Sequence, residues 1–238
     1  MKSERYFYST ASGLFLVLML IGFHSFYLHG RGFEGRPINP HIIVLDAVHG
    51  TAIALWFVLF FVQALLIAMR SRKLHMVLGW ASVVLGPVVA GLGTAVAIES
   101  VRMTDPEFHF FGMLYSRFLL VMLAEMALFA GFLMAGVVMR KKPRIHRNMM
   151  LMASLAILPG ATSRIETLLS IFGTTGWMGL FGATCFIGVS LFLVRWTIAR
   201  RLDVGFAWGI AIWVTTFTVS MHLALTPTWD HMAAVILR

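Results

Sequence analysis

The sequence predicts an all-α membrane protein, a polytopic bundle of seven transmembrane helices that forms a single membrane domain over residues 1–238. Apolar residues make up 59% of the chain and charged residues only 12%, about half of the ~25% found in soluble domains. Seven segments with almost no acidic or basic residues follow one another, and all but one exceed the ~20 residues that a spanning helix needs. The runs are continuous, which excludes a membrane β-barrel, whose strands alternate polar and apolar residues.

The seven segments are interpreted in chain order. The first follows Lys2 and Arg5 but has no small-residue cleavage site, so we expect an uncleaved helix rather than a signal peptide. The fourth is interrupted only by Glu125. The fifth is the shortest, and it spans the bilayer when His146 and Arg164 extend from its ends to the interface. The segments are residues 6–30, 47–69, 74–98, 118–139, 148–163, 167–194 and 204–229.

The composition also excludes several classes of protein. A soluble globular enzyme of this size could not bury 20 Phe and 16 Met, and a disordered chain would not contain them. The lone cysteine, Cys185, excludes a disulfide scaffold and a cysteine-based metal motif. The net charge of +9 comes from short basic clusters between apolar runs rather than from a basic stripe, so we expect no nucleic-acid partner.

The basic residues also predict an orientation. When the loops are alternated between the two sides, 13 of the 19 Lys and Arg residues fall on the side of the N-terminus. The positive-inside rule then places the N-terminus in the cytoplasm and the C-terminus outside. The lipid bilayer is the predicted partner of the apolar helix faces.

The second segment carries polar and ionisable residues on one helical face. Asp46, His49, Trp56 and Gln63 recur at helical spacing, and such a face points into a bundle rather than at lipid. Asp46 lies one turn before His49, close enough for its carboxylate to orient the imidazole. We therefore interpret Asp46 as a catalytic candidate, His49 as a cofactor ligand, and Trp56 and Gln63 as a substrate or packing face. A structural hydrogen bond to a neighbouring helix is the alternative.

Glu125 lies near the middle of the fourth segment, where an ionised carboxylate is costly. It is either a protonated residue bonded to a neighbouring helix or a proton carrier, and in the second interpretation it is a catalytic candidate. Arg117 lies about two turns earlier and roughly 80° around the helix, so it cannot pair with Glu125 directly. We assign Arg117 and Arg164 to the substrate or packing face.

The histidines of the predicted spans form two tiers. His24, His49 and His222 are expected near the outer face, whereas His75 and His146 begin the third and fifth helices at the inner face. Neutral imidazoles on facing helices are what a b-type haem or a bound metal requires. Because no His-x-x-x-His or Glu-x-x-His pair occurs, such a site must be assembled across helices. Anchoring in the lipid headgroups is the alternative, above all for His75 and His146.

Several motifs resemble those of a bacterial membrane family. They are residues 35–41 (GRPINPH), 49–56 (HGTAIALW), 59–63 (LFFVQ), 74–79 (LHMVLG) and 145–153 (IHRNMMLMA). The pattern is similar to the uncharacterised multi-pass proteins grouped as DUF2306 and their relatives over residues 36–164, whereas residues 167–229, with helices six and seven, are less distinctive. The resemblance implies a location in the bacterial inner (plasma) membrane. It also implies one recurring design, without indicating an activity, for His49, Trp56, Gln63, His75, His146 and Arg164.

These features favour membrane redox work, with a b-type haem, metal or quinone site assembled from histidines of several helices. A quinone or another membrane redox molecule would be the partner. Two alternatives stay open. One is a proton-coupled transporter or channel that uses Asp46, His49 and Glu125, and the other is an accessory or structural membrane protein without catalysis. The sequence does not decide between these functions or identify a metal.

Overall fold

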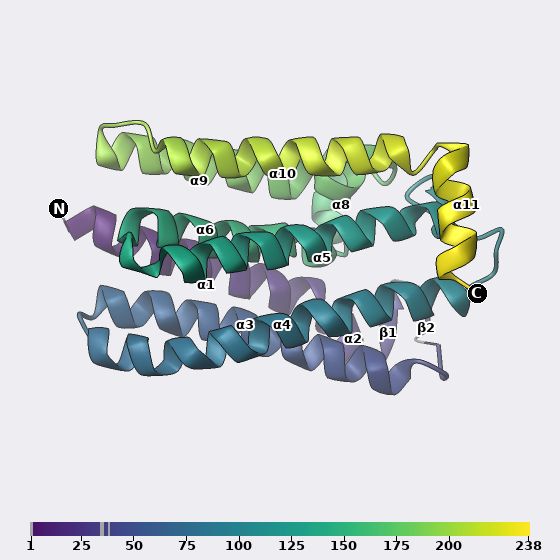
Figure 1. Ribbon diagram of the computed structural model, residues 1–238, viewed down its shortest axis with the longest axis horizontal. Helices are drawn as coiled ribbons and strands as arrows, with labels where there is room; N and C mark the ends of the chain where they lie inside the picture. Colours follow the sequence, from purple (N-terminus) through teal and green to yellow (C-terminus); the bar gives the residue numbers. More distant parts are fainter. Residues whose placement is uncertain (1, 34–35, 38) are drawn as a thin grey trace.

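The structure is a computed structural model that describes residues 2–33, 36–37 and 39–238. Long helices run side by side along one axis, and the two chain termini lie at opposite ends of the bundle (Figure 1). Within the described residues, six helices are long and apolar enough to cross a membrane, or seven if one bent pair counts as a single span. The predicted all-α membrane bundle is therefore confirmed.

The helices are joined by short loops and two small hairpins. The first half of the chain forms α1 (Lys2–Gly22), α2 (His24–His29), β1 (Arg31–Phe33), β2 (Arg36–Pro37), α3 (Ile43–Ala68), α4 (Arg72–Arg102), β3 (His109–Phe110) and β4 (Met113–Leu114). The second half forms α5 (Tyr115–Val138), η1 (Met139–Lys141), α6 (Pro143–Ala156), α7 (Pro159–Thr162), α8 (Glu166–Phe172), η2 (Met178–Gly182), α9 (Ala183–Ala199), α10 (Val204–Leu223) and α11 (Pro227–Ile236). β1 pairs with β2 and β3 with β4, both antiparallel.

The two ends of the bundle differ in their connections (Figure 1). We call one the basic end, because the α3–α4 and α5–α6 connections there contain residues 70–73 and 140–147, which are rich in Lys and Arg. We call the other the hairpin end, because the β1–β2 and β3–β4 hairpins lie there. The N-terminus lies at the basic end (Figure 1), so the predicted cytoplasmic N-terminus implies that the basic end faces the cytoplasm.

The sixth predicted span, residues 167–194, is wrong at its start. The short helix α8 ends at Phe172, and the apolar spanning helix begins only at Met178. Between them Gly173 and Gly176 have φ angles of 99° and 63°, which glycine adopts at little cost and other residues avoid. No charged residue lies at this break, so a prediction based on uncharged segments could not detect it.

The seventh predicted span, residues 204–229, is wrong at its end. The spanning helix α10 stops at Leu223, and Pro227 begins the separate helix α11. Proline favours the first turn of a helix because it needs no N–H partner there. The fifth predicted span corresponds to α6 and α7, after which the chain bends by 95° into α8.

A close-packed layer, which we call the Trp56 layer, lies midway along α3 and consists of Trp56, Gly86, Phe129 and Ser154. Trp56 is 1% exposed, and its indole N–H donates to Ser154 Oγ of α6 over 3.1 Å. Its ring meets Phe129 of α5 edge-on, with 4.9 Å between centroids, and lies beside Gly86 of α4. One side chain of α3 thus contacts three other helices.

A buried polar network joins four segments at the basic end. Tyr8 of α1 donates its hydroxyl to Asn148 Oδ1 of α6 over 2.6 Å, and Asn148 Nδ2 donates to Asp203 Oδ1 over 2.7 Å. Arg195 Nε of α9 lies 3.7 Å from the second carboxylate oxygen of Asp203, and both side chains are buried. Removal of either charged partner would leave the other buried and uncompensated. No sequence signal separates Arg195 from the exposed basic residues of this end.

Helix α11 lies crosswise over the hairpin end (Figure 1). Arg117 Nε and Nη2 of α5 donate to the two carboxylate oxygens of Asp230, over 2.9 and 2.8 Å. Trp229 Nε1 donates to the backbone carbonyl of Ser116 over 3.3 Å. Arg117 is therefore engaged with α11 in a partly exposed ion pair.

The backbones of α1 and α7 approach closely at Gly22. A Cβ atom at this position would lie 2.8 Å from the carbonyl carbon of Ala161 and 2.9 Å from its Cα, so another residue requires a backbone shift. Small residues allow this kind of close helix packing in membranes. The contact holds the end of α7, which precedes Arg164, against α1.

Gly22→Ala is expected to lower the stability of the protein by about 1–3 kcal/mol, because the added methyl group forces two packed backbones apart. Thermal unfolding of the detergent-purified protein measures the effect. Gly91→Ala is the matched control, since nothing lies within 4 Å of the Cβ position of this exposed residue in α4. Equal melting temperatures for the two variants would contradict the close approach.

The docking of α11 is expected to depend on pH. Hydrogen bonds from the Arg117 guanidinium hold the pKa of the Asp230 carboxyl below its ordinary value. The ion pair therefore supports docking at a pH above the ordinary aspartate pKa, and this support disappears as the pH falls through the lowered pKa. Amide hydrogen exchange in α11 should accelerate in acid in the wild type, and should be fast and free of this transition in Asp230→Asn. Identical pH profiles would argue against the pair.

Candidate functional site

A cavity of about 260 Å³ lies between the helices at the hairpin end. Its lining comes from α2, β1, α3, α4, β3, α5, α7, η2 and the bend that follows α7. Asn39 and Thr104, from loops at the hairpin end, also line it, so the cavity reaches that end of the bundle. Its polar lining includes Asp46, His49, Ser100, Tyr115, Glu125, Ser163 and Arg164, and its aromatic lining includes Phe23, Phe26, Phe110, Phe118 and Phe181.

Helix α3 places Asp46 and His49 in the cavity wall, one turn apart. The imidazole of His49 packs against α4 at Gly93, where its Cε1 lies 3.0 Å from the position of a Cβ atom. His49 Nδ1 is buried and has no hydrogen-bond partner in the described part of the chain. The two side chains share the cavity as predicted by their spacing, but no hydrogen bond by which Asp46 would orient this nitrogen is present.

The side chains of Glu125 (α5) and Arg164 both line the cavity, and both lie near Gly160. Glu125 Oε1 and Arg164 Nη1 each lie 3.9 Å from the position that a Cβ atom of Gly160 would occupy. The carboxyl and guanidinium groups therefore flank the same backbone position. The carboxyl groups of Glu125 and Asp46 both line the cavity, where they can contact a bound molecule.

Arg164 is held by the backbone on both sides of the cavity. Its Nε donates to the carbonyl oxygen of Gly32 over 3.1 Å, and its Nη1 donates to the carbonyl oxygen of Gly160. The guanidinium also stacks on the Phe23 ring, 4.6 Å from the centroid. These contacts fix the cation in one place and connect the β1 hairpin to the α7 bend.

The local sequence explains why Arg164 adopts this position. Helix α6 ends before Pro159, which begins the short helix α7. At the following bend the backbone N–H of Arg164 donates to Ala161 O rather than to Gly160 O. The Gly160 carbonyl is thereby released from the usual helical bond and accepts the Arg164 side chain instead. Thr162 Oγ1, 2.8 Å from Thr184 Oγ1, connects the bend to α9.

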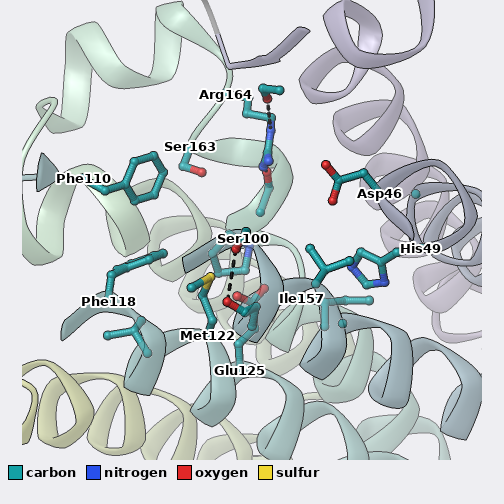
Figure 2. A pocket seen from close by; sticks show the side chains of 18 of the residues that line it. Asp46, His49, Ser100, Phe110, Phe118, Met122, Glu125, Ile157, Ser163 and Arg164 are labelled. Carbon is teal, nitrogen blue, oxygen red and sulfur yellow. Dashed lines mark hydrogen bonds between the residues drawn. The ribbon is translucent and has the colours of Figure 1, made fainter. Parts of the chain in front are cut away.

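Ionisable side chains and phenylalanine rings both line the cavity. Figure 2 shows Arg164 at the top, Glu125 at the bottom and His49 beside Asp46 on the right, with Phe110 on the left. Such a cavity can hold a small flat molecule, with its apolar ring against the phenylalanines and its polar atoms against the ionisable groups.

The other two histidines of the outer tier do not join this site. His24 is exposed, and its Nδ1 lies 2.7 Å from the carbonyl oxygen of Ile21 on its own helix turn. His222 is exposed at the end of α10 and borders a separate apolar groove with Trp177 and Met221. Similar depth along their helices does not bring these residues together, because His49 lines the cavity and His24 and His222 do not.

The two histidines of the inner tier do come together, at the basic end. The ring centroids of His75 and His146 are 6.3 Å apart, and the two rings are nearly perpendicular. Gln63 lies in the same region, where its backbone carbonyl is 3.3 Å from His75 Nδ1. The Trp56 layer separates this group from the cavity along α3. The predicted site residues thus form two groups rather than one.

No group of three or more His, Cys, Asp or Glu side chains with the spacing of a metal site occurs among the described residues. The cavity contains a single imidazole, whereas a b-type haem with two axial histidines requires two. Sequence reasoning missed Ser100 and Tyr115, whose hydroxyl groups are joined by a 3.2 Å hydrogen bond at the cavity wall. Neither residue lies in a polar motif that would have singled it out.

Comparison with known proteins identifies no relative: no family model, no curated protein and no solved structure matches this chain. The resemblance to DUF2306 proteins stays a prediction.

Arg164→Lys is expected to destabilise the protein by about 1–3 kcal/mol, because a lysine cannot donate to the Gly32 and Gly160 carbonyls from one planar group. Thermal unfolding in detergent measures the loss. Arg238→Lys, at the exposed C-terminus, is the matched control and should leave the melting temperature unchanged. A wild-type melting temperature for Arg164→Lys would show that the two carbonyl bonds do not stabilise the bend.

Proposed function

We propose that the protein binds a small lipophilic molecule of the quinone or quinol class in the cavity at its hairpin end, and exchanges protons with it through Glu125 and Asp46. The observation that carries the proposal is a cavity that combines an aromatic side with ionisable groups from three separate segments. The function is membrane redox work, in which a membrane redox partner supplies or removes the electrons.

The size and apolar lining of the cavity favour a one-ring head group. Pockets for drug-sized ligands usually have volumes of ~300–1,000 Å³, and the volume of about 260 Å³ falls just below that range. Phe110 and Phe118, whose rings are 4.9 Å apart, offer an aromatic surface for such a ring. A four-ring haem is disfavoured by this volume and by the single imidazole.

The polar groups favour a ligand with hydrogen-bonding oxygen atoms. A quinone carbonyl accepts hydrogen bonds and a quinol hydroxyl donates them, and an imidazole or a carboxyl group can take either role. A buried polar group without a partner costs about 1–3 kcal/mol, so a ligand that bonds to His49 Nδ1 gains from satisfying this nitrogen. Glu125 and Arg164, on either side of Gly160, supply a second contact point.

The two carboxyl groups supply a route for protons. Oxidation of a quinol releases two protons and two electrons, and Glu125 and Asp46 are the groups in the cavity that can accept the protons as carboxylates. The positive charge of Arg164 lowers the cost of a carboxylate beside it. Asn39 and Thr104 connect the cavity to the hairpin end, where the protons would leave.

Proton-coupled transport is less well supported. A transport path needs access from both ends, and the Trp56 layer lies between the cavity and Gln63 in this conformation. Proton flux into proteoliposomes that disappears in Glu125→Gln would favour transport instead.

The proposal is tested by binding of decylubiquinone and its reduced quinol to the detergent-purified protein, measured by equilibrium dialysis. Glu125→Leu is expected to weaken binding about 10- to 100-fold, which corresponds to the loss of a hydrogen bond to an ionisable group. Glu99→Leu removes a partly exposed glutamate of α4 that pairs with Arg102, and should bind like the wild type.

Equal affinity in the wild type and Glu125→Leu would place the quinone outside the cavity and contradict the proposal. Saturable binding of a fatty acid with no binding of the quinone would assign the cavity to anionic amphiphiles, and would equally contradict it. His49→Phe, which keeps the ring but removes both nitrogens, should also weaken binding at least tenfold.

A further inference from the structure

The neutral tautomers of His75 and His146 are determined by their backbone contacts. His75 Nδ1 lies 3.3 Å from the carbonyl oxygen of Gln63, and His146 Nδ1 lies 2.8 Å from the carbonyl oxygen of Gly136. A carbonyl oxygen can only accept a hydrogen bond, so the proton of each neutral ring lies on Nδ1. The Nε2 atom of each ring therefore keeps its lone pair, and this is the arrangement by which backbone carbonyls orient metal-binding histidines.

The distance between the two rings matches one shared ion. The ring centroids of His75 and His146 are 6.3 Å apart. An ion with imidazole nitrogens about 2 Å away on opposite sides holds the two ring centres roughly 6 Å apart. The spacing of the two rings therefore leaves room for one ion between their Nε2 atoms.

The surroundings contain further donors of a soft type. Met150 lies one helical turn after His146 on α6, and its sulfur would be 2.9 Å from a Cβ atom of Gly136, whose carbonyl binds His146. Gln63 is 8% exposed, and neither its amide oxygen nor its amide nitrogen has a hydrogen-bond partner in the described part of the chain. Its Nε2 would lie 3.9 Å from a Cβ atom of Gly79, one turn after His75 on α4.

We propose that His75 and His146 form a metal site at the basic end that binds a single copper(I) ion between their Nε2 atoms. Copper(I) accepts low, near-linear coordination by two neutral nitrogens, and soft thioether donors such as Met150 select it over harder ions. Arg70, Arg72 and Arg144 lie within five residues of the two histidines along the chain. Their positive charge disfavours divalent ions, because two neutral imidazoles leave the full charge of the ion uncompensated. The site shares no residue with the cavity and is independent of the function proposed for it.

The experiment is an anaerobic titration of the detergent-purified full chain with copper(I), in competition with the chelator bathocuproine disulfonate. The wild type is expected to bind one equivalent. His75→Asn and His146→Asn should each weaken binding at least tenfold, and the double variant should abolish it. His222→Asn, a histidine at the opposite end of the bundle, is the matched control and should bind like the wild type.

X-ray absorption of the copper-loaded wild type gives a second measurement that needs no variant. Two nitrogen neighbours with a low-coordinate edge, with or without one sulfur, support the site. Four-coordinate or oxygen-only copper would overturn it, as would equal affinity in the wild type and the double variant. A Soret band from haem bound through the same two histidines, or retention of Zn²⁺ alone, would also overturn the assignment to copper(I).

Discussion

The cavity depends on the hydrogen bonds that the Arg164 side chain donates to two backbone carbonyl groups. A transmembrane bundle offers no water to a carbonyl that leaves its helical bond, so a bend at membrane depth requires an internal donor. Arg164 supplies that donor to Gly160, and its second bond reaches Gly32 in the β1 hairpin. The same cation that stabilises the bend therefore contributes the positive charge of the cavity. Arg164 thus has both a structural role in the bend and a chemical role in the cavity.

The bundle separates its two groups of ionisable residues. Trp56 contacts α4, α5 and α6 at once, so a close-packed layer of four helices lies between the groups. The carboxyl groups of the cavity lie on the hairpin side of this layer, and the paired imidazoles lie on the basic side. Chemistry at one end can proceed without proton exchange with the other, and the two proposals made for the ends can be judged separately.

The sequence predicted the long helices because the length of an apolar run is a local property. It failed at Gly173 and Pro227, where the helix stops for reasons of backbone conformation that no charge reports. Ionisable residues could be singled out, since each is costly in hydrocarbon. Their grouping could not, because depth along a helix leaves its rotation and its neighbours undetermined. His24 and His49 share a depth and still point into different surroundings.

The position of the Trp56 layer also has an electrical consequence. A transmembrane voltage falls mainly across the region of lowest dielectric constant, and a charge that crosses it changes in energy by ~2.3 kcal/mol per 100 mV. Because the cavity reaches the loops at the hairpin end, a cavity filled from that side would leave most of the field beyond Glu125, across the tryptophan-centred layer. The proton uptake proposed for the cavity carboxyls would then be nearly insensitive to membrane potential, and the site would not work against the voltage of an energised membrane.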